Sequence, residues 1–97
     1  MFRTFKTIRK VFIYGSGATG KKVIKMLNSN IEVMGFIDSF ADSKNKSVMG
    51  INVFPPSRLK ENDFEFIIIA SMYQREILEE IDKQKVNLEK VVICTLT

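Results

Sequence analysis

Three glycines, Gly15, Gly17 and Gly20, constrain the fold of this chain more than any other feature of its sequence. They follow the apolar run VFIY at residues 11–14 and precede a helical pattern that begins near Ala18. Strand, tight turn and helix in this order let a chain bind phosphate with its own backbone. Gly15 would turn the chain off the strand, Gly17 would leave room for phosphate, and Gly20 would let the helix pack closely.

An acidic residue stands where such a unit places one. Asp38 follows a second apolar run at residues 31–37, about 20 residues beyond the glycines. A carboxylate at the end of the second strand can accept hydrogen bonds from ribose hydroxyls. The spacing therefore predicts a nucleotide site. Its predicted turn residues are Gly15, Ser16, Gly17, Ala18, Thr19 and Gly20.

Two other interpretations of these residues stay open. The turn could serve helix–strand packing alone, with Asp38 a solvated residue at a strand end. Gly15, Gly20 and Lys21 also match the G-x-x-x-x-G-K spacing of a triphosphate-binding loop. That loop needs a Ser or Thr hydroxyl at the next position to ligate magnesium, and Lys22 stands there instead.

Composition excludes several function classes. Histidine is absent, which excludes Ser-His-Asp and Cys-His catalysis and any His-ligated metal site. Cys94 is the single cysteine, so no disulfide forms within the chain, as is typical of the reducing cytoplasm. It follows an apolar run and is expected to be buried in the last strand. No run is long enough to span a membrane, and we expect a cytoplasmic protein.

The net charge favours anionic ligands without indicating nucleic acid. Lysine and arginine number 15 against 11 aspartates and glutamates, a formal charge of +4. Such a balance suits a nucleotide. Aromatic residues are not interleaved with the basic ones in a known nucleic-acid-binding pattern, so no nucleic-acid partner is expected.

The chain is long enough for one domain with a modest core. It has 97 residues, of which 45% are hydrophobic. We expect residues 10–97 to form a single domain and residues 1–9 a basic arm. The arm could lie across the domain edge, form a dimer contact or be directed weakly to a membrane.

Hydrophobic patterns predict an α/β fold. They indicate a doubly wound, open parallel sheet of about five strands in the order 3-2-1-4-5, with helices on both faces. The nearly continuous apolar run at 64–70 indicates a central strand covered on both sides. Ser71 and Gln74 have the spacing of a capping box for the second helix. Strands are expected at residues 10–14, 31–38, 51–54, 64–70 and 91–94, helices over 18–28 and beyond 74, a helical turn at 57–60 and a loop at 39–47.

Four segments together are similar to a known module: residues 11–20 (VFIYGSGATG), 33–38 (VMGFID), 50–54 (GINVF) and 67–71 (IIIAS). They resemble the N-terminal Rossmann-like nucleotide-binding domain of bacterial polysaccharide-biosynthesis proteins. Nucleotide-sugar dehydratase and epimerase relatives carry this domain, as do sugar acetyltransferase relatives. The resemblance covers almost the whole chain and implies a cytoplasmic nucleotide-binding module that serves cell-surface glycan synthesis.

The resemblance also implies ligands and site residues. NAD(H) is the implied cofactor, and a UDP-sugar is the alternative ligand of the same crevice. The motif match places the three glycines against phosphate, Asp38 against a ribose or base, and Ser71 at the border of the crevice. Ser71 could equally be the N-cap of the following helix.

The catalytic residues of those relatives are missing from this sequence. The dehydratases and epimerases typically use a Tyr or Met with a Lys four residues on, but Ile77 follows Tyr73 at that spacing. The hexapeptide repeats of the acetyltransferases are absent. No catalytic residue is predicted, and the chain is expected to bind nucleotide within a longer enzyme, beside a catalytic domain or in a homo-oligomer. The alternative is a non-catalytic interaction or sensor domain with a relic glycine loop.

Overall fold

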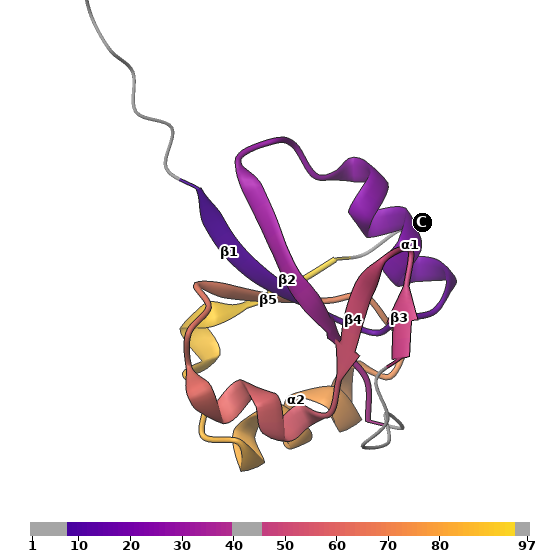
Figure 1. The fold of residues 1–97 in the computed structure, drawn as a ribbon. Coiled ribbons are helices and arrows are strands. Elements are labelled where there is room, and N and C mark those ends of the chain that lie inside the picture. Colours follow the sequence, from indigo (N-terminus) through magenta and orange to yellow (C-terminus); the bar gives the residue numbers. More distant parts are fainter. Residues whose placement is uncertain (1–7, 40–45, 95–97) are drawn as a thin grey trace, which may run out of the picture.

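Six strands form one mostly parallel sheet in the computed structural model, which describes residues 8–39 and 46–94 (Figure 1). Two α-helices and two 3₁₀ helices accompany the sheet. The elements in chain order are β1 (Arg9–Tyr14), α1 (Ala18–Met26), β2 (Ile31–Ile37), β3 (Lys46–Val48), β4 (Ile51–Phe54), η1 (Pro56–Glu61), β5 (Phe66–Ile69), α2 (Gln74–Lys83), η2 (Leu88–Lys90) and β6 (Val91–Ile93). Residues 1–7 of the predicted arm lie outside the described residues, whereas Arg9 opens β1.

The sheet has six strands and not the predicted five, and the added strand changes the strand order at one edge, while the five predicted strands keep the order 3-2-1-4-5. Its order is β3-β4-β2-β1-β5-β6, and β3 pairs antiparallel with β4 at one edge. Sequence patterns predicted five strands and placed residues 46 and 47 in a loop. Met49 (φ 55°) and Gly50 (φ 75°) join the two strands, and positive φ at both positions is the geometry of a tight hairpin turn. The hairpin adds the sixth strand. Residues 40–45 of the predicted loop lie outside the described residues.

The two faces of the sheet bury different helices, because successive side chains of a strand point to opposite faces. One face packs against α2 and η1, and the other packs against α1, so the two α-helices lie on opposite sides of the sheet (Figure 1). The first cluster contains Phe12, Tyr14, Ile37, Leu59, Phe64, Ile67, Ile69, Ile77, Ile81 and Val86. The second contains Ile13, Val23, Phe36, Val53 and Ala70.

The last two strands in the sheet order, β5 and β6, differ in how much of each is buried. In β5, Ile67 and Ile69 are fully buried on one face and Ile68 packs against the cluster on the other. The predicted covered strand is therefore confirmed. β6 is the edge strand beside it, and its Ile93 is exposed. Cys94 follows β6 and is half-buried, not buried as predicted, because the edge of the sheet is open to solvent.

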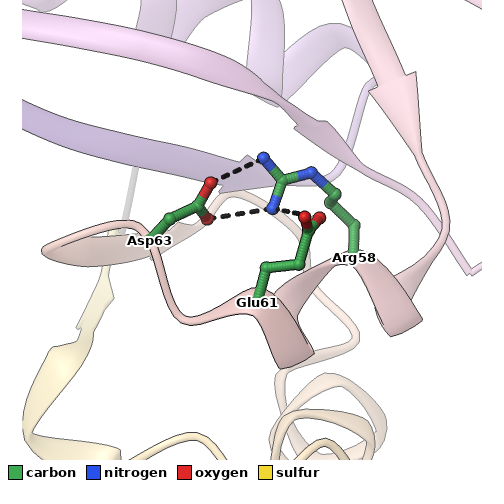
Figure 2. A network of polar contacts seen from close by, with 3 residues as sticks. All are labelled: Arg58, Glu61 and Asp63. Carbon is green, nitrogen blue, oxygen red and sulfur yellow. Dashed lines mark hydrogen bonds and ion pairs between the residues drawn. The ribbon is translucent and has the colours of Figure 1, made fainter.

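Arg58 fastens η1 to the sheet. Its guanidinium lies 5.2 Å from the ring centroid of Phe12 and 5.5 Å from that of Phe54. It donates two hydrogen bonds, of 2.9 and 2.8 Å, to the carboxylate of Asp63 and forms an ion pair of 2.8 Å with Glu61 (Figure 2). The hydrogen bonds raise the pKa of Arg58 and lower the pKa of Asp63.

We expect the Arg58–Asp63 pair to stabilise the protein at neutral pH and to lose this effect in acid. The pKa of Asp63 is lower in the folded chain, so its contribution is present above about pH 4, the ordinary carboxyl value, and is lost as the pH falls through the folded pKa. Asp63→Asn should lower the free energy of unfolding by about 0.5–1 kcal/mol at pH 7, because solvent screens a side chain that is 41% exposed. Urea unfolding of both proteins from pH 7 to pH 2 measures this. A loss that does not change with pH would mean that Asp63 acts without its charge.

Candidate functional site

A cleft of about 980 Å³ lies at the carboxyl ends of three neighbouring parallel strands, β2, β1 and β5. The turn after β1, the two residues after β2, and the loop after β5 with the start of α2 form its walls. β1 pairs with β2 on one side and with β5 on the other, so the chain winds outward from β1 in both directions. In open α/β sheets, ligands bind in the crevice at this point.

The structure brings seven of the eight predicted site residues together around this cleft. They are Gly15, Ser16, Gly17, Ala18, Thr19, Asp38 and Ser71. Gly20 is not among the lining residues. It is buried beneath the turn, where a Cβ would overlap the carbonyl oxygen of Gly15 and lie 3.2 Å from the ring of Phe36. Its position is that of a close contact between helix and strand.

The first two glycines of the turn differ in what requires them. Gly15 has φ +117°, and a Cβ there would lie 2.6 Å from the carbonyl oxygen of Ala70. Both the backbone angle and the approach of β5 therefore demand glycine. Gly17 has φ −81°, and a Cβ there would meet no atom within 4 Å. Neither its backbone angle nor its packing in the protein requires glycine.

The N-terminus of α1 opens at the cleft without a side-chain cap. Gly17 is the N-cap, and its carbonyl oxygen accepts the first helical bond from the Lys21 amide at 3.1 Å. The first turn carries no acidic residue. The amides that begin an α-helix have no partner within the helix, and they form the positive end of its dipole. This end of α1 is therefore chemically suited to an anion.

Asp38 is tied to the glycine turn. The hydroxyl of Ser16 donates a 2.7 Å hydrogen bond to Oδ2 of Asp38, and the Asp38 amide donates to the carbonyl of Phe54 at 3.0 Å. These bonds fix the carboxylate at the end of β2 relative to the turn that follows β1. A sugar hydroxyl donor at the turn would therefore meet an acceptor whose position is already set.

Tyr14 lines the cleft, although the sequence indicated it only as part of a strand. Its hydroxyl lies 2.6 Å from Oγ of Ser39, and the side chain is 2% exposed. Burial raises the pKa of the Tyr14 phenol, and the hydrogen bond to Ser39 opposes this shift. The phenol is therefore neutral at physiological pH. Its signal in the sequence was a polar tip on the last residue of an apolar strand, next to the glycines.

The loop after β5 does not form the predicted capping box. α2 begins at Gln74 with Tyr73 as its N-cap. Ser71 lies two residues before that cap, and its Oγ accepts a 3.1 Å hydrogen bond from the Tyr73 amide. The N-cap interpretation of Ser71 is therefore wrong, because its hydroxyl closes a turn ahead of the helix. Met72 and Tyr73 also line the cleft, and neither was among the site residues predicted from the sequence.

The charges around the cleft are acidic. Asp38 and Glu76 line it, and the lining includes no lysine or arginine among the described side chains, which are those of residues 8–39 and 47–94. An anion in the cleft would therefore depend on backbone amides and on neutral donors such as the side chains of Thr19 and Gln74. In the same part of the chain, no group of three or more His, Cys, Asp or Glu side chains could hold a metal ion. Nor is any of its helices long and apolar enough to cross a membrane.

Comparison with known proteins gives a structural neighbour and a family. The chain is similar to the crystal structure of UDP-D-quinovosamine 4-dehydrogenase from Vibrio fischeri, with a TM-score of 0.69 and 25% sequence identity. This similarity covers 92% of the present chain and 80% of that chain. No curated protein matches the present chain. Residues 7–92 match the family described as C2185-like, N-terminal, and the chain therefore belongs to that family.

Proposed function

We propose that this chain binds a nucleotide, either NAD(H) or a UDP-sugar, as a module of nucleotide-sugar biosynthesis. The observation that carries the proposal is that the uncapped N-terminus of α1 and the carboxylate of Asp38 line one cleft at the carboxyl ends of parallel strands. A diphosphate needs the first group, and a ribose diol needs the second. The proposal includes a Rossmann-like fold, a cytoplasmic location, and a single domain with a basic arm before it, the boundary being moved from Lys10 to Arg9 because β1 begins there.

The diphosphate is assigned to the turn beside Gly17. A phosphate that approaches the main chain there would meet the amides that open α1, and no residue beyond the neighbours of Gly17 would crowd it. Because the described lining holds no basic side chain, these amides would be the main hydrogen-bond donors to the phosphate, beside neutral side chains such as Thr19. Ser16 would hold Asp38 in place while the carboxylate accepts from a ribose hydroxyl.

The nucleotide-sugar class is supported by the structural neighbour. That neighbour is UDP-D-quinovosamine 4-dehydrogenase, a UDP-sugar dehydrogenase, and the similarity covers most of both chains. We assign binding and not chemistry to the cleft of the present chain. Ile77 occupies the position where a catalytic lysine would follow Tyr73, and it is 6% exposed in the core. A second domain, a partner or another copy would supply the reaction.

A thermal-shift screen tests the proposal directly. The wild-type protein is heated with NAD, NADP, UDP and UDP-N-acetylglucosamine, each over a range of concentrations. A ligand at 100 times its dissociation constant stabilises the folded state by about 2.7 kcal/mol. For a domain of this size, that is a rise in Tm of about 10–20 °C. A flat response to every nucleotide would overturn the proposal in favour of an interaction domain with a relic glycine turn.

Among dinucleotides, we expect NAD to bind more tightly than NADP by about 5-fold or more. The 2′-phosphate of NADP would lie against the Asp38 carboxylate, and two like charges about 4 Å apart repel by about 1 kcal/mol even in water. Lys44 and Lys46 follow in the chain and could neutralise that phosphate; Lys44 and the side chain of Lys46 lie outside the described part of the structure. Asp38→Asn keeps the size of the side chain but removes its charge, so it should reduce the difference between the affinities for NAD and NADP. Titration of both proteins with both ligands measures it, and equal wild-type affinities would remove Asp38 from this role.

A further inference from the structure

Tyr73 is unusual among the aromatic side chains of the described residues because it is exposed. Its side chain is 63% exposed, whereas the other aromatic side chains in the described ranges are buried or half-buried. Met72 beside it is 85% exposed. Both side chains line the cleft. Single exposed apolar side chains occur elsewhere in the described residues, but these two are adjacent and both border the cleft, which makes them candidates for contact with a ligand.

Hydrogen bonds hold both the amide and the carbonyl group of Tyr73. Its amide donates to the Ser71 hydroxyl, and its carbonyl oxygen accepts from the Ile77 amide, each at 3.1 Å. Ile77 and Ile81 then bury α2 against the sheet. The ring therefore has only its own side-chain torsions to lose when it contacts a ligand, which keeps the entropic cost of binding low.

The strand order places Tyr73 and Asp38 on opposite sides of the glycine turn. Asp38 follows β2, the turn follows β1, and Tyr73 follows β5, and these strands are neighbours in the order β2-β1-β5. A ligand with a ribose at Asp38 and its diphosphate at the turn would continue toward Tyr73. The group that would reach Tyr73 is the one beyond the diphosphate, which is a ribose that carries the nicotinamide ring in NAD and a hexose in a UDP-sugar.

From this placement we propose that Tyr73, flanked by Met72, is the platform for the ring at the distal end of the nucleotide. The inference rests on the proposed function and adds a specificity-determining contact to it. A phenol face can stack on a planar nicotinamide, and it can also pack against the apolar face of a pyranose. Both rings offer a face that can pack against the phenol ring, and the experiment below distinguishes between them.

The test compares whole ligands with truncated ones. NAD is measured against ADP, and UDP-N-acetylglucosamine against UDP, by titration calorimetry on wild type and on Tyr73→Ala. The whole ligand of the correct pair should bind wild type more tightly than its truncated form. Tyr73→Ala should weaken the whole ligand by about 5-fold or more and leave the truncated form unchanged. Tyr73→Phe should restore the wild-type difference, because the ring face is retained.

Two controls separate this contact from a change in folding. Leu88→Ala removes a similarly exposed apolar side chain that is not part of the cleft lining, and it should leave every affinity unchanged. All variants should keep the wild-type Tm. The sequence has two tyrosines and no tryptophan, so quenching of tyrosine emission by NAD that disappears in Tyr73→Leu would report the ring contact directly.

The outcomes distinguish the two proposals. If no whole or truncated ligand binds wild type, the proposed function fails and this inference falls with it. If ADP or UDP binds and Tyr73→Ala weakens whole and truncated ligands equally or not at all, the distal-ring contact is overturned while nucleotide binding stands. Selective loss with NAD identifies nicotinamide as the distal group, and selective loss with the UDP-sugar identifies the hexose.

Discussion

Gly20→Ala is expected to destabilise the protein by about 3 kcal/mol or more, the upper end of the range for overpacked interiors. A Cβ at this position would overlap the carbonyl oxygen of Gly15, which is backbone and cannot move aside as a side chain could. It would also press on the buried ring of Phe36. The helix α1 would have to shift away from β1 and β2. Urea unfolding and the Tm measure the loss, and each kcal/mol lowers the Tm by about 4–8 °C.

Gly50→Ala is the matched control for this variant. Gly50 has φ +75°, but a Cβ there would meet nothing within 4 Å. Gly50→Ala therefore introduces backbone strain without a steric overlap, and we expect it to lower the free energy of unfolding by about 1 kcal/mol. Wild-type stability of Gly20→Ala, or a loss no larger than that of Gly50→Ala, would contradict the close contact between α1 and the turn.

Gly17→Ala, in contrast, should reduce nucleotide affinity much more than it reduces stability. With a negative φ and open space around a Cβ, the substitution should change the free energy of unfolding by less than about 1 kcal/mol. A methyl group there would occupy the space that a phosphate needs to reach the amides of α1. The loss of one charge-assisted hydrogen bond is worth about 1.5–3 kcal/mol, so nucleotide affinity should fall by about 10-fold to 150-fold.

The measurement needs one titration and one melting curve for each variant. The ligand is whichever nucleotide gives the largest thermal shift with wild type. Without ligand, the Tm of Gly17→Ala should lie within about 4–8 °C of the wild-type value, and the variant should lose about half or more of the ligand-induced shift. If the variant instead loses stability while its affinity is retained, Gly17 does not face a phosphate.

The elements predicted from the sequence were those with strong local signals. The apolar run at residues 11–14 and the glycines after it are sufficient to indicate β1, the turn and the start of α1. β3 gave no such signal. Val48 is the one apolar residue of that strand, and Met49-Gly50 is not a common hairpin pair. The strand is held by its pairing with β4, which is a property of the assembled sheet.

The candidate site divides in the same way. Gly15 to Thr19 are contiguous, and Asp38 directly follows a strand at the spacing from the glycines that nucleotide-binding units use. The sequence alone is therefore sufficient to predict these residues. Tyr73 and Ser39 join the cleft only because β5 and β2 flank β1. Ser71 shows the limit of local rules. Its spacing fits a cap, but its hydroxyl bonds the Tyr73 amide and the helix starts later.

The parallel pairing of β1 with β5 also has a consequence for how the protein folds. Val11 pairs with Phe66 and Tyr14 with Ile69, so these contacts close a long loop of chain before they stabilise anything. Ala70, which lies against Gly15, arrives with β5 in the same step. A folding intermediate without β5 would therefore have the glycine turn but only half of the cleft. Docking of β5 should limit the folding rate, and a nucleotide should slow unfolding of the complete domain without accelerating the steps before it.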